Sequence, residues 1–344
     1  MNTFKNIEKI SFSPGITWLI GQIMEARGKQ DLWIQTKPEI MKNLKEIAIV
    51  QSTESSNRIE GVEVEKKRLV PLLAGKVKPM DRPEEEVLGY KNALNFIHSN
   101  YKKIDIEPDV IKKLHEIAQG GFSGDAGKWK KKNNEIIEIF PNGDSMIRFV
   151  PVSAEETPKY IRQLCLTFRD IQRQDKLPDL ISIASFVFDF LCIHPFRDGN
   201  GRVSRLLTLL LLYQSNYLVG RYISIERLIE ESKENYYEVL QQSSKNWHEV
   251  KHDPSKWWYY FLSTTRSAYR ELEEKIKNLG SLDNKTSLIS GIIMEQITPF
   301  TLGDIQKLAP SVSIQMIKKI MAGLKSDGIL KLQGKGRGAK WVKQ

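Results

Sequence analysis

Twelve residues near the middle of the chain read His194-Pro-Phe-Arg-Asp-Gly-Asn-Gly-Arg-Val-Ser-Arg205. An apolar run precedes them at 180–193, and a second one follows at 206–213. The first run is apolar on nearly every face, which is typical of a helix buried inside a globule. Pro195 ends that helix, because the residue before a proline disfavours the α conformation. The pattern therefore predicts a helix, a short polar loop and a second helix.

The predicted loop carries residue types that bind phosphate. Gly199 and Gly201 permit positive φ angles, so consecutive N–H groups can turn inward around an anion. The N-terminus of the following helix also favours negative charge. Arg202 and Arg205 lie three residues apart on one helix face, where both can bind phosphate oxygens.

Two further side chains add reactive chemistry to this loop. Asp198 is a hard oxygen ligand of the kind that Mg²⁺ uses together with substrate phosphates. His194 is the only side chain of the loop that can take up a proton near neutral pH. A phosphate-binding loop, a metal ligand, positive charges and a base together predict transfer chemistry on a nucleoside triphosphate.

The twelve residues resemble the motif of the Fic family, His-Pro-Phe-x-Asp/Glu-Gly-Asn-Gly-Arg-x-x-Arg, at every defined position. The resemblance implies transfer of AMP from ATP to a hydroxyl of a target protein. It implies that His194 deprotonates the target Ser, Thr or Tyr, that Asp198 holds Mg²⁺, and that Phe196 packs into the core and fixes the loop. The implied phosphate-binding residues are Gly199, Asn200, Gly201, Arg202 and Arg205.

A second short pattern lies upstream, at Ser55-Ser-Asn-Arg-Ile-Glu-Gly61. Ser56 and Glu60 are four residues apart, so on a helix they share a face, and Gly61 is suited to ending that helix. Alone this is an ordinary helix end. Beside the Fic motif it resembles the inhibitory motif of the family, Ser/Thr-x-x-x-Glu-Gly/Asn. The resemblance implies that Glu60 pairs with Arg205 and blocks the productive position of the γ-phosphate.

A β-hairpin interrupts the otherwise helical pattern. Two strand-like segments flank the turn residues Pro141-Asn-Gly-Asp-Ser145. The hairpin resembles the Fic flap, which lies over the active site and aligns the target backbone by strand addition. A target protein is therefore expected along residues 135–150. The preceding Gly127-Lys-Trp-Lys differs from the family pattern Gly-x-Tyr/Trp-Arg only in Lys130.

An aromatic pair, Tyr236 and Tyr237, lies in a helix predicted near 230–242. It resembles the pair that lines the adenine pocket of Fic proteins, which makes Tyr237 a candidate ATP-binding residue. A pair packed in the core explains the pattern equally well. The family often has asparagine seven residues beyond the second tyrosine, where this chain has Ser244.

A competing metal motif lies downstream, at His248-Glu-Val-Lys-His252. On a helix this spacing places two imidazoles on one face, as zinc proteases require. Lys251 places a cation between the two ligands, and Asp253-Pro254 ends the helix at once. We therefore expect both histidines to be surface residues near a helix end.

The end of the chain is strongly basic. The whole chain has a net charge of +10, and residues 285–344 contain ten Lys and Arg against three Asp and Glu, a difference of +7. Three predicted helices in this region, followed by a Gly-rich hairpin, resemble a winged helix-turn-helix. In a DNA reader, 313–326 would enter the major groove and Lys335-Gly-Arg337 would contact phosphates. DNA and a docking protein both remain open as partners, and the scarcity of long donors at 311–316 favours protein.

Length and composition complete the sequence-based interpretation. The 344 residues, 40% hydrophobic and 27% charged, indicate a globular protein of two or three domains. We expect a mainly α fold with a helical N-terminal region at 1–82 carrying the inhibitory motif, a Fic catalytic core with a β-hairpin flap at 83–279, and a winged-helix domain at 285–344. Two apolar-context cysteines and the lack of a secretory or membrane-spanning run predict a cytoplasmic protein with no membrane contact.

Three functions remain open at this level. The favoured one is a protein adenylyltransferase that uses ATP and Mg²⁺ on a target protein and on itself, autoinhibited by Glu60. The same site could instead remove AMP, with Glu60 orienting a water molecule. From a different class, the chain could be an ATP-sensing, DNA-binding regulator. Self-association into a homodimer is a further hypothesis that no residue pattern specifies.

Overall fold

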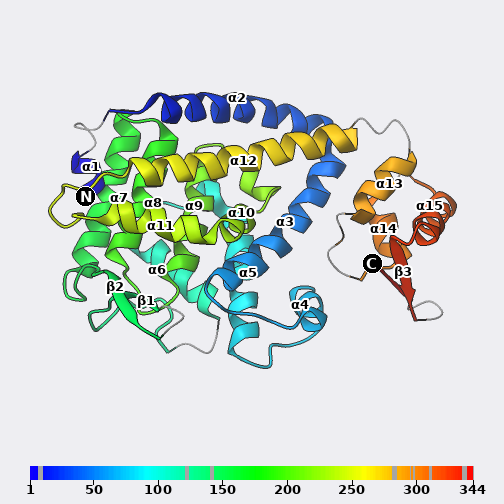
Figure 1. Ribbon diagram of the computed structural model, residues 1–344, viewed down its shortest axis with the longest axis horizontal. Coiled ribbons are helices and arrows are strands. Elements are labelled where there is room, and N and C mark those ends of the chain that lie inside the picture. The colour runs from blue at the N-terminus through cyan, green and yellow to red at the C-terminus, as the bar shows by residue number, and fades with distance from the viewer. Residues whose placement is uncertain are drawn as a thin grey trace.

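The computed structural model describes residues 1–6, 11–120, 124–139, 143–280, 285–294, 296, 299–309, 312–334 and 339–343. Within these residues the chain is mainly helical, as predicted, and its strands form two separate two-stranded sheets. Figure 1 shows a long helical body with a smaller C-terminal unit beside one end.

The helices of the main body are α1 (Asn2–Asn6), α2 (Pro14–Thr36), α3 (Pro38–Ile59), α4 (Lys66–Leu73), α5 (Arg82–Asn100), α6 (Pro108–Gln119), α7 (Thr157–Gln174), α8 (Asp179–Ile193), α9 (Asn200–Gln214), α10 (Ile225–Glu231), α11 (Lys233–Ser244) and α12 (Ser255–Gly280). Two short 3₁₀ helices, η2 (Tyr101–Lys103) and η3 (Val219–Arg221), join them. The flap strands are β1 (Ile136–Ile139) and β2 (Ser145–Phe149), and the C-terminal unit contains α13 (Lys285–Met294), α14 (Leu302–Leu308), α15 (Ile314–Ser326), β3 (Leu330–Gln333) and β4 (Lys340–Lys343).

Proline positions determine where several helices begin. Proline stands in the first turn of α2, α3, α5, α6 and α7, where its missing N–H costs no hydrogen bond. Helix α3 begins at Pro38 itself, and α5 begins one residue before Pro83. Asp81 caps α5 by accepting a hydrogen bond from the Glu84 N–H at 3.0 Å.

The centre of the main body is the helix pair α8 and α9. Nearly every residue of α8 is buried, as its apolar sequence predicts, and α9 is buried along most of its length. Helices α5, α6, α7 and α12 pack around the pair, and α2 lies along α12 (Figure 1). Helix α3 packs against α5, α9 and α10, which brings its C-terminal end to the start of α9. The inhibitory pattern therefore shares a core with the loop it is expected to regulate.

Two glycines inside helices give a matched test of this packing. A Cβ on Gly89, in α5, would lie 2.6 Å from the carbonyl oxygen of Ile117 in α6, whereas a Cβ on Gly21, in α2, would meet nothing within 4 Å. We expect Gly89→Ala to destabilise the fold by about 1–3 kcal/mol through overpacking. We expect Gly21→Ala to stabilise it by up to about 1 kcal/mol through helix propensity. Urea unfolding measures both, and equal effects would contradict the close α5–α6 contact.

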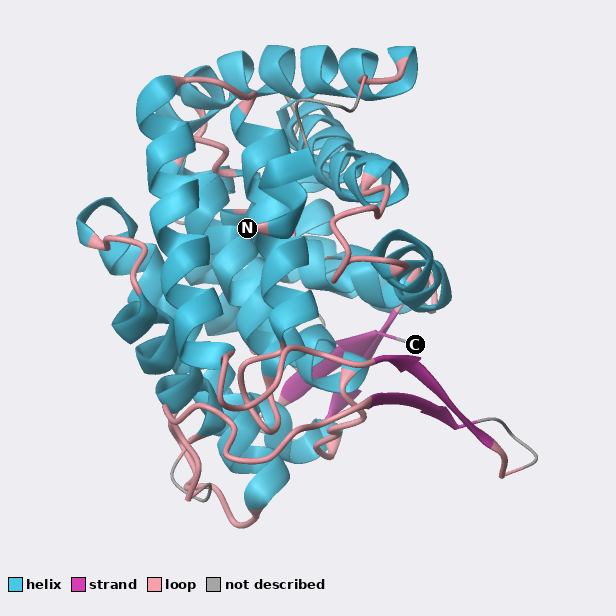
Figure 2. Ribbon diagram, turned by 90° about the vertical axis from the view of Figure 1, so that its left-hand side faces the viewer, coloured by secondary structure: helices cyan, strands magenta, loops and turns pink. Residues whose placement is uncertain are grey.

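The predicted hairpin is present as β1 and β2. The strands are antiparallel, Ile137 pairs with Ile147, and a bulge lies between Ile136 and Ile137. Residues 140–142 of the predicted turn lie outside the described residues. Figure 2 shows the hairpin standing out from the helical body. Ile137, Met146 and Ile147 are exposed, so the hairpin presents apolar side chains to solvent.

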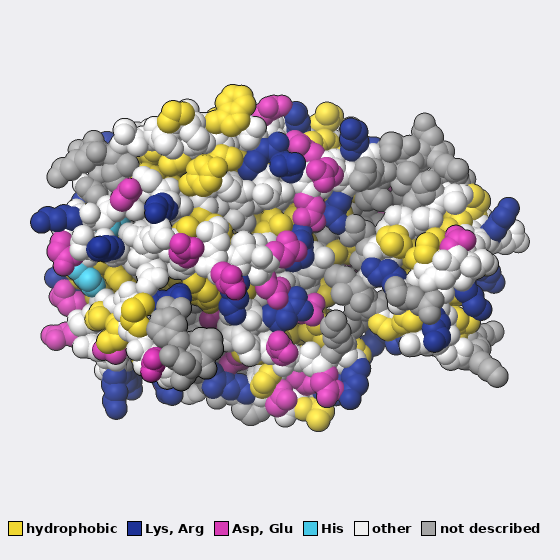
Figure 3. All heavy atoms as spheres, in the orientation of Figure 1, with side chains coloured by type: hydrophobic (Ala, Val, Ile, Leu, Met, Phe, Trp, Pro, Cys, Tyr) yellow, Lys and Arg dark blue, Asp and Glu magenta, His cyan; other side chains and the backbone are white. Residues whose placement is uncertain are grey.

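The C-terminal unit contains the elements expected for residues 285–344. Its three helices and two antiparallel strands share a small core of their own, in which Ile289, Phe300, Ile317 and Leu330 are buried. Lysines such as Lys318 and Lys319 are exposed on α15, and dark blue side chains mark the outer edge of this unit at the right of Figure 3. The predicted wing tip, 335–337, and most of the predicted linker, 281–284, lie outside the described residues.

The two cysteines and the most apolar helices can be compared with what the sequence predicts. Cys165 and Cys192 are free thiols buried in α7 and α8, as predicted. Among the helices of the described residues, none combines the length and apolar character needed to cross a membrane.

Buried histidines predict a loss of stability in mild acid. Burial is the main cause that lowers the pKa of His98 to about 3 and the pKa values of His115 and His252 to about 4. In the unfolded chain these groups titrate near 6.5. As the pH falls from about 6.5 toward 4, the unfolded state therefore binds protons that the folded state cannot, and stability is lost.

The expected slope is about 1.4 kcal/mol per pH unit for each such histidine. Urea unfolding at a series of pH values between about 7 and 5 measures it. His98→Asn is expected to reduce this slope by the contribution of one histidine, about 1.4 kcal/mol per pH unit. An unchanged slope in that variant would show that His98 is not held neutral in the folded protein.

Candidate active site

The loop between α8 and α9 is held in an unusual backbone conformation. Helix α8 ends at Ile193, and His194 follows with φ 51° and ψ 61°. This left-handed backbone conformation is rare for residues other than glycine, asparagine and aspartate. Gly199, with φ 79°, turns the chain into α9, whose first residue is Asn200. The predicted order of helix, loop and helix is confirmed.

Asn200 closes the loop on itself. Its side-chain amide donates to the Phe196 carbonyl at 2.8 Å, and its Oδ1 accepts from the Phe196 N–H at 2.9 Å. The Asn200 side chain thus fixes the loop rather than facing an anion. The anion-binding capacity lies in the backbone at the N-terminus of α9, where the first N–H groups have no partner within the helix.

Aromatic packing holds the loop against the core. Phe196 is fully buried and stacks on the ring of His115 with 3.8 Å between centroids and 4° between planes. His115 also donates from Nε2 to the Asp198 carbonyl at 3.0 Å and accepts from the Gly127 N–H at 2.9 Å. His115, from α6, therefore positions the loop, a role its sequence position alone did not reveal.

His194 has the properties of a general base. Its Nδ1 lies 3.3 Å from the Leu191 carbonyl, which can only accept, so Nδ1 carries the proton and Nε2 is left able to accept one. Burial is the main cause that lowers the pKa of His194 to about 4, and the charge of Lys130 adds to this effect. The imidazole is therefore neutral at physiological pH, as a base must be before it acts.

Glu60 lies over the start of α9. Its Oε1 is 2.8 Å from Nη2 of Arg205, and a Cβ placed on Gly201 would lie 2.2 Å from the same oxygen. Ser56 accepts from Arg205 Nε at 2.8 Å through its hydroxyl and from Nη2 at 2.9 Å through its carbonyl. The carboxylate thus occupies the space in front of the helix N-terminus where an anion would bind.

Electrostatic attraction favours the ion pair between Arg205 and Glu60. Burial alone disfavours a charged guanidinium, but the Glu60 carboxylate, with smaller contributions from Tyr90 and Tyr236, raises the pKa of Arg205 above its usual value. Nη1 of Arg205 is buried without a hydrogen-bond partner among the described residues. An unsatisfied buried donor of this kind is available to a second acceptor such as a phosphate oxygen.

Arg202 lies deeper than the sequence suggests. Its Nη1 is 2.7 Å from Oε2 of Glu86, and both side chains are almost fully buried. Arg82 bridges from the other side, at 2.6 Å to Glu86 and at 2.8 Å to Asp198. Glu86 and Arg82, near the start of α5, are not predicted as site residues from the sequence, because neither belongs to a motif that points to the loop.

Asp198 has the properties expected of a Mg²⁺ ligand. Its side chain is about half exposed, at 56%, and lies beside the N-terminus of α9. A single carboxylate is a donor that Mg²⁺ commonly uses, together with water and substrate phosphates. Oδ2 of Asp198 is paired with Arg82 in this structure, so an ion bound there would have to displace that pair.

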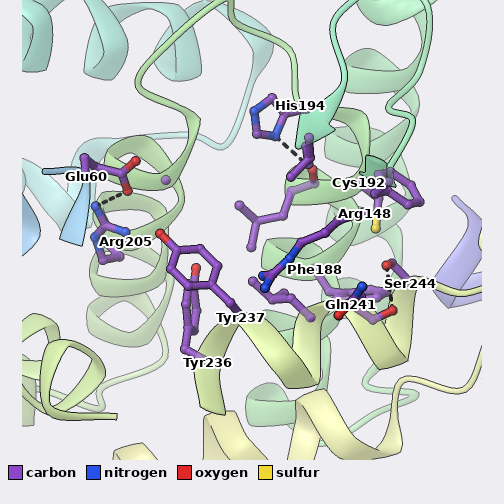
Figure 4. A pocket seen from close by; sticks show the side chains of 15 residues that line it. Glu60, Arg148, Phe188, Cys192, His194, Arg205, Tyr236, Tyr237, Gln241 and Ser244 are labelled. Carbon is purple, nitrogen blue, oxygen red and sulfur yellow. Dashed lines mark hydrogen bonds and ion pairs between the residues drawn. The ribbon is translucent and has the colours of Figure 1, made fainter. Parts of the chain in front are cut away.

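A cavity lies beside His194 and opens to solvent. Its volume is about 140 Å³, smaller than the usual range for ligand pockets, and the Glu60 side chain forms part of its wall. Glu60 and Arg205 lie at one end of it, His194 lies apart from them above, and Tyr236 and Tyr237 from α11 lie below (Figure 4). The structure thus brings together the predicted base, the predicted inhibitory pair and the predicted aromatic pair around one space.

Other wall residues were not predicted from the sequence. Arg148, in β2, reaches over the cavity with its guanidinium carbon 6.0 Å from the centre of the Tyr237 ring (Figure 4). Gln241 and Ser244, one and two helical turns beyond Tyr237, line the same space. Ser244 is the position where the family often has asparagine.

The alternative zinc motif does not form a helix. Residues 246–250 adopt turns, His248 contacts the Val150 carbonyl at 2.8 Å, and His252 contacts the Thr3 hydroxyl at 2.9 Å. The expectation that both histidines lie on the surface was wrong for His252, which is 2% exposed. A polar partner 249 residues away in the sequence accounts for its burial.

A helical core, a hairpin over a histidine-bearing loop and a helix N-terminus beside a cavity make up this site. Residues 105–212 match the domain family described as Fic/DOC family. The match includes the whole loop and the helices on both sides of it.

Solved structures extend the similarity beyond that domain. A Fic family protein from Desulfovibrio desulfuricans G20 shares 18% identity and a TM-score of 0.64, with 97% of each chain covered. A Fic domain containing signaling protein from Bacteroides thetaiotaomicron shares 20% identity and a TM-score of 0.58, over 76% of this chain and 97% of that one. Fic-1 from C. elegans shares 19% identity and a TM-score of 0.57, over 75% and 71%. At these identities the likeness shows the fold.

Proposed function

We propose that this chain transfers AMP from ATP to a hydroxyl group of a target protein and of itself. The observation that carries the proposal is the cavity in which neutral His194, the N-terminus of α9 and the Arg205 guanidinium face one space. The match to the Fic/DOC family supports the proposal, because this family includes enzymes that transfer AMP.

The reaction follows from the positions of these groups. His194 Nε2 takes the proton of the attacking hydroxyl as its oxygen forms a bond to the α-phosphorus. The bond from the α-phosphorus to the oxygen that bridges to the β-phosphate breaks, and pyrophosphate leaves. The backbone N–H groups at the start of α9 and the guanidinium of Arg205 stabilise the developing negative charge. A bound Mg²⁺, held by Asp198, would supply further charge neutralisation on the phosphates.

The adenine is expected to bind against α11. Tyr237 offers a flat face to the cavity, Gln241 and Ser244 offer polar groups, and Tyr236 supports Tyr237 from the core with its ring 5.2 Å away. Arg148 would close the cavity from the hairpin. A ring face combined with a few polar groups is typical of nucleotide base pockets.

The target protein is expected to dock along the hairpin. Ile137 and Ile147 are cross-strand neighbours that each expose about half of their side chains, 50% and 51%. Short exposed strands of this kind bind an extended segment by main-chain hydrogen bonds. Strand addition would hold the target hydroxyl near His194 without requiring a specific target sequence.

Glu60 would act as the brake on this reaction. Its carboxylate lies in front of the α9 N-terminus and holds Arg205, so a γ-phosphate cannot reach either group. ATP would then bind only with its phosphates displaced from the geometry that in-line attack requires. Removal of Glu60 would restore the productive pose.

The position of a radioactive label in ATP tests the proposed reaction. Glu60→Gly protein, incubated with Mg²⁺, is expected to become labelled by α-labelled ATP and not by γ-labelled ATP, since the γ-phosphate leaves within pyrophosphate. Labelling from the γ position would indicate direct phosphate transfer and contradict the proposal. Loss of label from pre-modified protein without new labelling would favour AMP removal instead.

A further inference from the structure

The segment between α6 and β1 contains a lysine that is buried beside the catalytic loop. Lys130 exposes only 5% of its surface, although lysine is one of the residues least often found buried. The neighbouring Lys128, Lys131 and Lys132 are exposed in the same segment. A buried ammonium is costly unless hydrogen bonds satisfy it, so the contacts of Lys130 need a specific explanation.

Lys130 holds the backbone on both sides of His194. Its Nζ donates to the Ile193 carbonyl at 3.2 Å, and its backbone N–H donates to the Pro195 carbonyl at 2.9 Å. Nζ also donates to Oδ1 of Asn134 at 2.8 Å, just before the hairpin. Residues 193 and 195 are the two immediate neighbours of the base in the chain.

The backbone between these two contacts needs such support. His194 has a left-handed conformation, with φ 51°, and a strained residue of this kind persists only where its surroundings enforce it. Ile193 is the last residue of α8, so its carbonyl has no partner within the helix. Lys130 supplies that partner and fixes the next turn of the chain at the same time.

The charge of Lys130 also acts on the imidazole. Burial lowers the pKa of Lys130 itself to about 8, so its ammonium is intact at pH 7. After burial, Lys130 is the next largest cause that lowers the pKa of His194, while Glu60 and Asp198 oppose it. The other charged or titratable groups around the same space come from β2, α8, α9 and α11, and are Arg148, Cys192, Arg205, Tyr236 and Tyr237.

We propose that Lys130 is a positioning residue for the transfer reaction, one that clamps the backbone on both sides of His194 and disfavours the imidazolium through its charge. This inference rests on the proposed function for its catalytic consequence. Its physical content, the orientation and protonation of His194, does not depend on any transfer. Lys130 keeps the imidazole neutral before attack and promotes release of the proton afterwards.

Three substitutions separate the clamp from the charge. Lys130→Arg keeps donors and charge, Lys130→Gln keeps a donor without charge, and Lys130→Met removes both. Lys128→Met, two residues away on the surface, is the matched control. If Lys130→Met does not fold, Lys130→Gln still tests the effect of the charge.

The first readout is the NMR titration of the His194 ring, which needs no activity. Lys130→Gln and Lys130→Met are expected to raise the pKa of His194 by roughly one unit, whereas Lys130→Arg and Lys128→Met leave it unchanged. An unchanged pKa of His194 in both uncharged variants would overturn the inference, whether or not the protein transfers AMP.

The second readout is the pH profile of self-modification in a Glu60→Gly background. Lys130→Met is expected to lower the rate about tenfold near pH 7 and to move the acidic limb of the pH profile to higher pH. Lys130→Arg is expected to restore both the rate and the limb. A shifted His194 titration in a protein that modifies nothing would support the effect of the Lys130 charge and overturn the proposed function. A tenfold loss of rate with an unmoved limb and an unmoved titration would overturn the charge effect and with it the proposal.

Discussion

Glu60→Gly is expected to raise the rate of self-modification by on the order of 10²-fold over wild type. In the wild-type protein the carboxylate lies 2.8 Å from Arg205 and would be 2.2 Å from a Cβ on Gly201. On the proposed mechanism a phosphate cannot share that space, so the wild-type protein is expected to exclude the productive pose of ATP. Removing the side chain frees the α9 N-terminus and one face of the Arg205 guanidinium together.

Initial rates of labelling from α-labelled ATP measure this effect. Glu60→Gln, which keeps the shape of the side chain but loses its charge, is expected to lie between wild type and Glu60→Gly. The matched control is Glu54→Gln, on the same helix, because Glu54 pairs with Arg58 and does not reach Arg205. Equal rates for wild type and Glu60→Gly, with ATP bound in both, would remove the inhibitory role.

His194→Ala in the Glu60→Gly background is expected to lower the rate by about 10²–10⁴-fold, the usual contribution of a general base. ATP affinity should change little, because the proposed phosphate and adenine contacts come from α9 and α11. Labelling rates measure the first effect, and calorimetric titration with ATP and Mg²⁺ measures the second.

A neighbour in the same loop provides the control for His194. Arg197→Ala changes an exposed residue whose guanidinium pairs with Asp125 on the surface, and it is expected to keep most of the activity. If His194→Ala abolished nucleotide binding as well as transfer, His194 would be a ligand-binding residue and the base would have to be sought elsewhere.

Local sequence pattern was sufficient to predict the centre of the fold. The uniformly apolar segments flanking the loop could only be buried helices, and proline and glycine positions marked where those helices end and begin. The structure places Glu60 against Arg205, as the resemblance to the inhibitory motif implied. These features depend on neighbours within a few residues or on a long motif, which is why sequence was enough.

Distant partners that belong to no recognised motif were not predictable. Glu86 meets Arg202 across 116 residues, and Lys130 meets the Ile193 carbonyl across 63. Neither contact is marked by a repeating pattern of residues in the sequence. In the sequence Lys130 is only a single departure from a family pattern, and its burial is apparent only in the folded chain.

Residue type alone does not show which atoms of a residue face the site. The Asn200 side chain closes the loop onto Phe196, which leaves only its backbone for the predicted contact with phosphate. Tyr236 and Tyr237 were either core or pocket residues on sequence grounds; Tyr236 is 3% exposed, and both rings lie on the wall of the cavity. Whether a polar or aromatic side chain faces a core or a cavity depends on helix rotation, which tertiary packing sets.

The central claim is that one site transfers AMP, with His194 as its base and Glu60 as its brake. Intact mass spectrometry of wild type, Glu60→Gly and Glu60→Gly/His194→Ala, each after incubation with ATP and Mg²⁺, tests all three parts at once. The account predicts an added mass of one AMP group in Glu60→Gly and no addition in the other two. No addition in any of the three proteins, or equal addition in all of them, would contradict it.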